Sequence, residues 1–169
     1  ADIGFVGFPN AGKSTLLGRL TNANPKVGAY PFTTKIPNLG VYKIDEQDVV
    51  LADIPGIIEG ASHGAGLGLR FLKHIARTRG LVFLIDVSQP DYLTSFDILL
   101  SELRTFSDEL AGRKRVIFAT KMDSEGSEDA LKKLKEKYKD EEIQGISVFS
   151  GYGMENIREI FSRLVLQEE

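Results

Sequence analysis

Eight residues near the N-terminus combine the types and the spacing that phosphate binding requires. The stretch from Gly7 to Ser14 reads Gly-Phe-Pro-Asn-Ala-Gly-Lys-Ser and fits the pattern G-x-x-x-x-G-K-[ST] of a phosphate-binding loop, or P-loop. Gly7 and Gly12 allow a tight turn in which successive backbone N–H groups face an anion. Lys13 can reach the β- and γ-phosphates of a nucleotide, and the Ser14 hydroxyl can bind Mg²⁺.

The segments on either side of this loop suit it. Residues 3–6 form a short apolar run that is typical of a buried strand, and Leu16, Leu17 and Leu20 mark one face of a helix. A phosphate at the start of that helix would meet its positive end. The alternative is a plain strand–turn–helix corner without a ligand, and the motifs further along the chain weigh against it.

A second candidate motif begins at an acidic residue after a later apolar run. Asp53 ends that run and precedes Pro55 and Gly56. A carboxylate in this position can hold a Mg²⁺-bound water, and the Gly56 N–H can face a γ-phosphate. The competing interpretation of Asp53 is an ordinary turn residue at a strand end.

A third candidate motif, Thr120-Lys121-Met122-Asp123, follows the apolar run 116–119. The carboxylate of Asp123 can accept two parallel hydrogen bonds from N1–H and N2–H₂ of guanine. Adenine lacks this pair of donors, so Asp123 would select GTP over ATP. Lys121 can lay its alkyl stem along the base. A P-loop ATPase is the rival interpretation, and competition between guanine and adenine nucleotides separates the two.

The order of the expected elements predicts the fold. Strands alternate with helices, except for a hairpin formed by residues 39–44 and 49–52. This pattern predicts an α/β fold of three layers, with a doubly wound, mostly parallel six-stranded sheet and one antiparallel edge strand. We expect a long helix that ends at Gly112 and a last strand that ends at 148–149. The ends of the parallel strands would bring the three motifs together.

Composition narrows the class of protein. The chain has 169 residues, 42% of them hydrophobic and 27% charged, with a formal net charge of −3 and no cysteine. These values predict one globular domain, 1–169, with no disulfide framework and no general affinity for DNA. No apolar run reaches membrane-spanning length, and we expect a cytoplasmic monomer without membrane contact. Because a strand begins almost at Ala1, we expect a domain trimmed from a larger multidomain protein.

Taken together, the motifs resemble the ordered signature of Ras-like P-loop GTPases of the translation-factor class. Longer stretches are similar to the Obg (CgtA-type) family: the P-loop itself, residues 30–34 with 37–40, residues 53–56 running on to 59–61, and residues 66–79. The resemblance covers essentially the whole chain. It implies a GTPase domain with a Ras-like P-loop NTPase fold, Mg²⁺ as cofactor, GTP and GDP as ligands, and the large ribosomal subunit as partner.

The resemblance also implies roles for individual residues. Residues 24–38 and 56–70 would be switch loops that change on loss of the γ-phosphate. Lys13, Thr34 and Gly56 would act in hydrolysis, and Ser14, Thr34 and Asp53 would hold the metal. The nucleotide-binding residues would be Gly7, Phe8, Pro9, Asn10, Ala11, Gly12, Lys13, Ser14, Thr15, Phe32, Thr33, Thr34, Lys35, Ile36, Asp53, Ile54, Pro55, Gly56, Thr120, Lys121, Met122, Asp123, Ser150, Gly151 and Tyr152.

Four positions modify these expectations. Thr120 stands where the family usually has Asn and can replace only part of its hydrogen bonding, and Gly151 stands where Ala is usual. Ile57 cannot orient the attacking water as the glutamine of Ras does, so intrinsic hydrolysis should be slow. Asn10 has two open interpretations, as a K⁺ ligand beside the phosphates or as a residue that shapes the loop.

The expected function is a slow GTPase switch in assembly of the large ribosomal subunit. The alternative is an interaction module that senses GTP, GDP or an alarmone, in which hydrolysis is incidental.

Overall fold

The computed structural model describes residues 2–9, 11–21, 26–27, 38–54 and 78–166. Its strands are β1 (Ile3–Gly7), β2 (Lys26–Val27), β3 (Asn38–Ile44), β4 (Gln47–Asp53), β5 (Gly80–Asp86), β6 (Lys114–Thr120) and β7 (Ile143–Gly145). Its helices are α1 (Lys13–Leu20), α3 (Tyr92–Phe106), α4 (Asp108–Ala111), α5 (Ser127–Lys137), the 3₁₀ turn η2 (Met154–Asn156) and α6 (Ile157–Val165).

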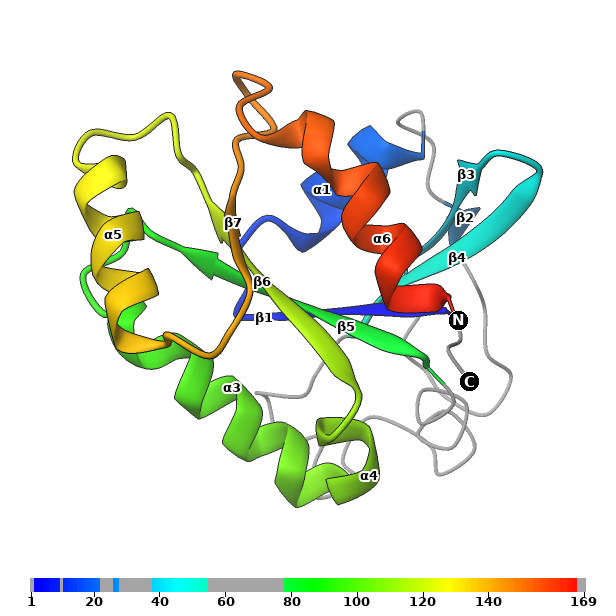
Figure 1. Cartoon of the computed structure of the whole chain (residues 1–169), viewed down its shortest axis with the longest axis horizontal. Coiled ribbons are helices and arrows are strands. Elements are labelled where there is room, and N and C mark those ends of the chain that lie inside the picture. The colour runs from blue at the N-terminus through cyan, green and yellow to red at the C-terminus, as the bar shows by residue number, and fades with distance from the viewer. Residues whose placement is uncertain (1, 10, 22–25, 28–37, 55–77, 167–169) are drawn as a thin grey trace.

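The strands form one sheet in the order β2-β3-β4-β1-β5-β6-β7 (Figure 1). β1 pairs in parallel with β4 and β5, and β5, β6 and β7 continue in parallel. β3 is antiparallel to β4, as the hairpin pattern predicts. The six expected strands are all present. The two-residue β2, which lies in a stretch expected to be a loop, pairs with β3 and extends the sheet by one short strand.

Two layers of helix cover the sheet, with α1 and α6 on one face and α3, α4 and α5 on the other (Figure 1). All seven residues of β5 are buried, as expected for a central strand covered on both faces. Its alternate side chains belong to two separate cores: Leu81, Phe83 and Ile85 pack beneath α3, and Val82 and Leu84 pack beneath α1 and α6.

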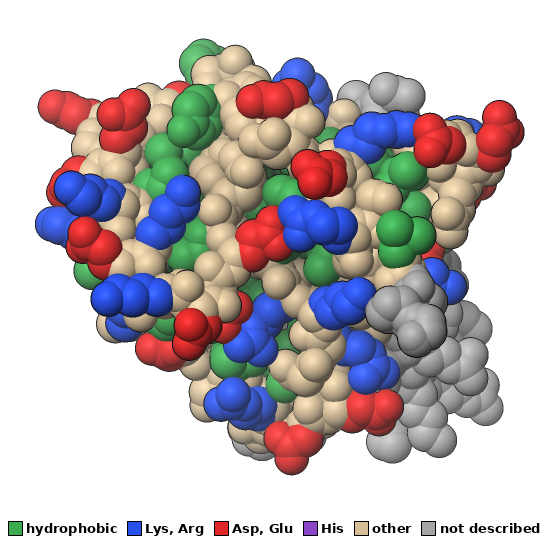
Figure 2. Space-filling view, viewed as in Figure 1, with side chains coloured by type: hydrophobic (Ala, Val, Ile, Leu, Met, Phe, Trp, Pro, Cys, Tyr) green, Lys and Arg blue, Asp and Glu red, His purple; other side chains and the backbone are tan. Residues whose placement is uncertain are grey.

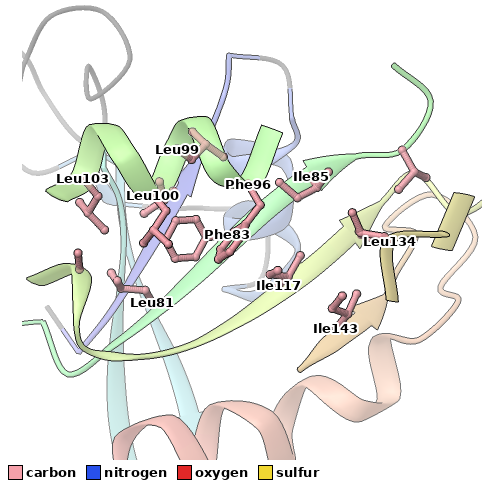
Figure 3. Packing of buried hydrophobic residues seen from close by; sticks show 14 of the residues in the cluster. Leu81, Phe83, Ile85, Phe96, Leu99, Leu100, Leu103, Ile117, Leu134 and Ile143 are labelled. Carbon is pink, nitrogen blue, oxygen red and sulfur yellow. The ribbon is translucent and has the colours of Figure 1, made fainter. Parts of the chain in front are cut away.

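Two phenylalanine rings pack against each other within the mostly aliphatic core beneath α3 (Figure 3). The Phe83 and Phe96 rings meet edge to face with centroids 5.0 Å apart, and Tyr138 meets Phe96 in the same way at 5.1 Å. Around them lie Leu99, Leu100, Leu103, Ile117, Leu134 and Ile143 (Figure 3). This packing holds β5, β6 and the helix α3 as one unit and so fixes the strand ends.

Two element boundaries differ from the expected ones. The long helix does not run unbroken to Gly112, because Ser107 adopts an extended backbone (φ −163°, ψ 112°) between α3 and α4. Its hydroxyl accepts a hydrogen bond from the Leu110 N–H and caps α4. The last strand ends at Gly145 and not at 148–149, which shifts the loop that follows it.

The parallel strands deliver the predicted motifs to one edge of the sheet. β1 ends at Gly7, β4 at Asp53 and β6 at Thr120. The register pairs Phe5 with Asp53, which keeps the ends of β1 and β4 adjacent. Ligands of doubly wound sheets bind at this edge, so the fold positions a site there.

The surface around this sheet carries both signs of charge. On the face shown in Figure 2, basic and acidic side chains are interspersed. Several are paired, as in Arg163–Glu142 at 2.7 Å and Arg158–Asp45 at 2.6 Å. None of the helices in the described residues combines the length and the apolar character needed to cross a bilayer.

Candidate nucleotide-binding site

The P-loop has the backbone that its glycines allow. Gly12, the residue before α1, has φ 104° and ψ 13°, a left-handed conformation that L side chains rarely adopt. A hydrogen bond from the Ala11 N–H to the Phe8 carbonyl (3.1 Å) closes the turn before it. The loop therefore joins β1 to α1 with the N-terminus of an eight-residue helix facing the edge of the sheet.

Lys13 points back into the loop. Its ammonium donates a hydrogen bond to the Gly7 carbonyl (2.9 Å) and lies 3.3 Å from Oδ1 of Asp53. Only 14% of the Lys13 side chain and 12% of the Asp53 side chain are exposed. Low exposure strengthens an ion pair by reducing its screening by water. The two predicted motifs thus meet at this pair.

Ser14 and Asp53 supply oxygen atoms suited to Mg²⁺. The Ser14 hydroxyl donates a weak hydrogen bond to Oδ2 of Asp53 (3.5 Å). The other carboxylate oxygen, Oδ1, is buried and forms the ion pair with Lys13, but it accepts no hydrogen bond of good geometry from the described residues. Within those same residues, no group of three or more His, Cys, Asp or Glu side chains is placed to hold a metal. Mg²⁺ is usually held by one or two carboxylates together with waters and phosphate oxygens, so Ser14 and Asp53 fit this ion.

A cavity of about 290 Å³ opens beside the P-loop. Three segments line it: the P-loop with the start of α1, the loop after β6, and the loop after β7. Its lining residues are Ala11, Gly12, Thr15, Leu16, Thr120, Lys121, Asp123, Ile146, Val148 and Phe149. The walls are mostly apolar and include one carboxylate, which suits a flat base recognised by hydrogen bonds at one edge.

Asp123 is held in place by a residue that is absent from the predicted site. The hydroxyl of Ser147, which is fully buried, donates a 2.8 Å hydrogen bond to Oδ1 of Asp123. The Ser147 oxygen also accepts a hydrogen bond from the Ser150 N–H (3.0 Å). Ser147 therefore links the loop after β7 to the acidic side chain that would read the base.

The loop after β7 begins earlier than the sequence predicted, because the strand ends at Gly145 and not at 148–149. As a result, the cavity is lined by Ile146, Val148 and Phe149 of this loop. The predicted residues Ser150, Gly151 and Tyr152 do not line it. The signal that could have identified Ser147 is its position as the first polar residue after the apolar end of the strand.

Thr120 connects the base side of the site to the P-loop. Its hydroxyl, in a residue 6% exposed, lies 3.1 Å from the Ala11 carbonyl and 3.3 Å from the Ile85 carbonyl. A hydroxyl has one proton, so the two carbonyls share a single donor, whereas an Asn amide would offer two. Thr120 thus retains a connection between β6 and the P-loop, although with fewer donors than Asn.

Lys121 is oriented by a second acidic residue absent from the predicted site, Asp86. Lys121 has a left-handed backbone (φ 66°), and its ammonium lies 2.9 Å from Oδ2 of Asp86. Asp86 also accepts hydrogen bonds from the backbone N–H (2.9 Å) and hydroxyl (2.6 Å) of Ser88. Burial acts to raise the pKa of Asp86, but the hydrogen bonds from Ser88 and Lys121, together with the Lys121 charge, outweigh it and hold the pKa below its usual value.

Other predicted residues have packing roles or line a neighbouring cavity. Ile54 and Met122 are buried in the core beneath α3, and Phe8 packs against it. Phe8, Pro9 and Ala11 also line a second cavity of about 400 Å³ that reaches the start of α3. Eight predicted residues lie outside the described residues, and their roles stay predictions: Asn10, Phe32, Thr33, Thr34, Lys35, Ile36, Pro55 and Gly56.

The class of protein follows from the fold, the P-loop and the adjacent cavity. The chain belongs to the 50S ribosome-binding GTPase family, whose model matches residues 2–121. This range includes the P-loop, Asp53, Thr120 and Lys121.

Relatives in this class support the resemblance seen in the sequence. The chain is 58% identical to GTPase Obg of Treponema denticola over 165 residues, covering 97% of this chain and 43% of that protein. It is 49% identical to GTPase Obg of Borrelia recurrentis over 163 residues, covering 96% of this chain and 50% of that protein. The resemblance to the Obg family is confirmed, and the chain spans about half the length of these curated relatives or less.

Solved structures confirm the expected fold class. The cytosolic domain of the T. maritima FeoB iron transporter in its GMPPNP form aligns with a TM-score of 0.75 at 19% identity, covering 99% of this chain and 65% of that one. Aquifex aeolicus Era bound to GDP.AlF4⁻ aligns with a TM-score of 0.67 at 19% identity, covering 99% and 57%. At this identity the likeness concerns the fold alone.

Proposed function

We propose that this chain binds GTP and GDP with Mg²⁺ and hydrolyses GTP slowly, as a switch that acts on the large ribosomal subunit in the cytoplasm. The observation that carries the proposal is the shared wall between the two halves of the site. Ala11 and Gly12 belong to the P-loop, Thr15 directly follows it in α1, and all three line the cavity that contains Asp123. A nucleotide could therefore place its phosphates on the P-loop and its base edge at Asp123.

Each described residue has a distinct role in this proposal. Lys13 neutralises the β- and γ-phosphates, and the backbone N–H groups around Gly12 bind their oxygens. Ser14 and Asp53 hold Mg²⁺, which supplies charge neutralisation when bound. Asp123, held by Ser147, accepts two hydrogen bonds from guanine. Phosphoryl transfer depends mainly on such positioning and charge stabilisation.

The proposed slow rate rests on Ile57, which follows the predicted γ-phosphate ligand Gly56 in the sequence. An aliphatic side chain cannot orient the attacking water. The proposed ribosomal partner rests on the description of the matched family, and support from the full-length relatives is indirect because the chain covers half of them or less.

Single-turnover hydrolysis with and without large ribosomal subunits tests this function. We expect slow release of phosphate from GTP by the chain alone, faster release with the subunits, and none above background for Lys13→Ala. If the subunits neither bind the chain nor change the rate, the ribosomal part of the proposal is wrong. Partner binding that follows GDP, GTP or alarmone occupancy, with no dependence on turnover, would favour the nucleotide-sensing alternative.

K⁺ is a second proposed ion, with Asn10 as its ligand beside the phosphates. It would supply additional positive charge beside the phosphates. We expect faster GTP hydrolysis in K⁺ than in Na⁺ at equal ionic strength, and no difference between the two salts in Asn10→Ala. Equal rates in the two salts for the unmodified chain would exclude this ion.

A further inference from the structure

Phe149 stands out among the apolar side chains of the described residues. It is 90% exposed, whereas Val41, Ile98, Tyr152 and Leu166, the other large hydrophobic side chains on the surface, range from 38% to 57%. Exposing an aromatic ring forgoes the favourable free energy of removing it from water. The ring of Phe149 is therefore accessible to a ligand, and its surroundings indicate whether it can bind one.

The position of Phe149 indicates what it binds. It lines the 290 Å³ cavity together with Asp123 and Lys121. Phe149 comes from the loop after β7, whereas the other two come from the loop after β6. An aromatic face, an alkyl stem and a carboxylate around one cavity form a set suited to a flat heteroaromatic ring with hydrogen-bond donors at its edge.

The backbone on both sides of Phe149 is anchored. Arg19 of α1 donates a hydrogen bond to the Val148 carbonyl (3.0 Å). The Ser150 N–H is bonded to the Ser147 hydroxyl (3.0 Å), and the Gly151 N–H to the Ser147 carbonyl (2.7 Å). These contacts hold the residues next to Phe149, so the ring needs only its own two side-chain torsions to reach a ligand.

A glycine completes this anchoring. Gly153 has φ 74°, and a Cβ atom there would overlap the Gly145 carbonyl oxygen. The Ser147 N–H bonds to the Tyr152 carbonyl (2.9 Å), which closes the loop back onto the end of β7. The loop that carries Phe149 is thus packed directly against the strand that precedes it, and its shape is set before a ligand binds.

We propose that Phe149 is a base-contacting residue whose ring stacks on the face of the guanine that Asp123 binds at its edge. This inference rests on the proposed guanine-nucleotide binding. Stacking on an aromatic ring strengthens binding of any base, because every base has a π-face. Phe149 therefore raises affinity, while Asp123 sets the choice of base.

The sequence offers a direct optical test, because the chain contains no tryptophan. In Phe149→Trp the new indole is the only one, and stacking on guanine should quench its fluorescence when GDP is added with Mg²⁺. The matched control is Ile98→Trp, at a position that is 45% exposed on α3 and lines neither cavity. The control indole should not respond to GDP.

Affinity measurements complete the test. Phe149→Ala should raise the dissociation constant for GDP by about tenfold, the order found when a stacking aromatic is removed, and Phe149→Leu should raise it less. The same factor should apply to IDP, whose base lacks the 2-amino group that Asp123 binds. Ile98→Ala should bind GDP as the unmodified chain does.

The outcomes separate this inference from the function on which it rests. If the unmodified chain binds GDP tightly and neither Phe149→Ala nor the Phe149→Trp fluorescence shows an effect, the stacking role is wrong and guanine binding stands. An exposed ring without influence on GDP would then point to contact with a macromolecule. If the unmodified chain does not bind GDP, both proposals are overturned.

Discussion

The base half and the phosphate half of this site are built in different ways. In the base half, Asp123 is bonded to Ser147 and Lys121 to Asp86, and neither supporting residue is expected to touch the nucleotide. In the phosphate half, Lys13 and Asp53 pair with each other, and both are expected to contact the phosphates or Mg²⁺. The base half is thus oriented by supporting groups, and the phosphate half by the binding groups themselves.

This difference predicts separate roles for the two halves. The preformed base half favours selection of one base over another, because a buried polar group that the wrong base leaves unpaired costs binding free energy. The Lys13–Asp53 pair must exchange partners when phosphate and Mg²⁺ bind, since Lys13 would then neutralise phosphate oxygens. The phosphate half is therefore the part whose state can follow the nucleotide, as a switch requires.

The largest expected effect lies in the base half. Asp123→Asn keeps an oxygen that can accept the Ser147 hydrogen bond, but its amide reverses one hydrogen-bond polarity toward the base. We expect preference to turn from GTP to XTP, with loss of GTP affinity on the order of 10⁴, because sites built to hydrogen-bond a group reject ligands that lack the match. Titration of both nucleotides measures this change. A variant that kept its full preference for GTP would place the base elsewhere.

The next effect lies in the phosphate half. Lys13→Ala removes the charge that meets the phosphates and leaves the 12% exposed Asp53 side chain without its ion-pair partner. We expect loss of tight GDP and GTP binding. Titration with a fluorescent GTP analogue detects this loss, and circular dichroism verifies that the variant is folded.

A matched variant sharpens this second prediction. Ser14→Ala removes only the proposed Mg²⁺ ligand, so it should weaken binding in Mg²⁺ and leave binding in EDTA almost unchanged. Affinity of Lys13→Ala equal to that of the unmodified chain would contradict the assignment of the phosphate site.

The sequence predicted the phosphate half better than the base half. The P-loop pattern has fixed spacing, so Lys13 and Ser14 could be assigned from residue types alone. Asp53 could be paired with them because parallel strands end at one edge of the sheet. The loop after β7 could not be placed in the same way, because its position depends on where a short strand ends. That strand ends at Gly145, and this end brings Ser147 into hydrogen-bond contact with Asp123.

Supporting residues were also beyond the sequence pattern. Asp86 ends the buried strand β5, and nothing in its neighbourhood along the chain shows that Lys121, in the loop after β6, has its ammonium 2.9 Å from the Asp86 carboxylate. The break at Ser107 was equally hidden, since the apolar spacing continues through it to Leu110. Tertiary packing determines both features: the contact between distant segments and the local change in the backbone. Neither can be read from the spacing of residue types.

A smaller effect tests the connection between the two halves. Thr120→Val keeps the shape of the side chain but removes the proton shared by the Ala11 and Ile85 carbonyls. Loss of one buried hydrogen bond costs about 1 kcal/mol of stability. If the loosened P-loop must be ordered again when GDP binds, this cost reappears in binding and lowers GDP affinity by roughly fivefold. Isothermal titration calorimetry can resolve this change. Thr120→Ser, which keeps the hydroxyl, is the control, and equal affinities for all three proteins would show that the connection has no effect on binding.

The last expected effect concerns stability rather than nucleotide affinity, and it depends on pH. The pKa of Asp86 is lowered in the folded chain, so its charged form contributes stability that is present above the unfolded pKa of about 4 and is lost as pH falls through the lower folded value. Asp86→Asn should therefore lower the free energy of unfolding by about 1–2 kcal/mol at pH 7 and by less as pH falls below 4. Urea denaturation across this range measures the difference. A difference that stayed constant down to the acid limit would show that the charge of Asp86 does not stabilise the fold.

The central claim is that the P-loop and Asp123 line the same cavity, so that one guanine nucleotide can contact both. The most direct measurement is displacement of a fluorescent GDP analogue from the unmodified chain by unlabelled GTP and ATP in Mg²⁺. The structure predicts that GTP displaces the analogue and that ATP fails to do so even at a molar excess on the order of 10³. Displacement by ATP at concentrations comparable to those of GTP would contradict the assignment of Asp123 and with it the proposed function.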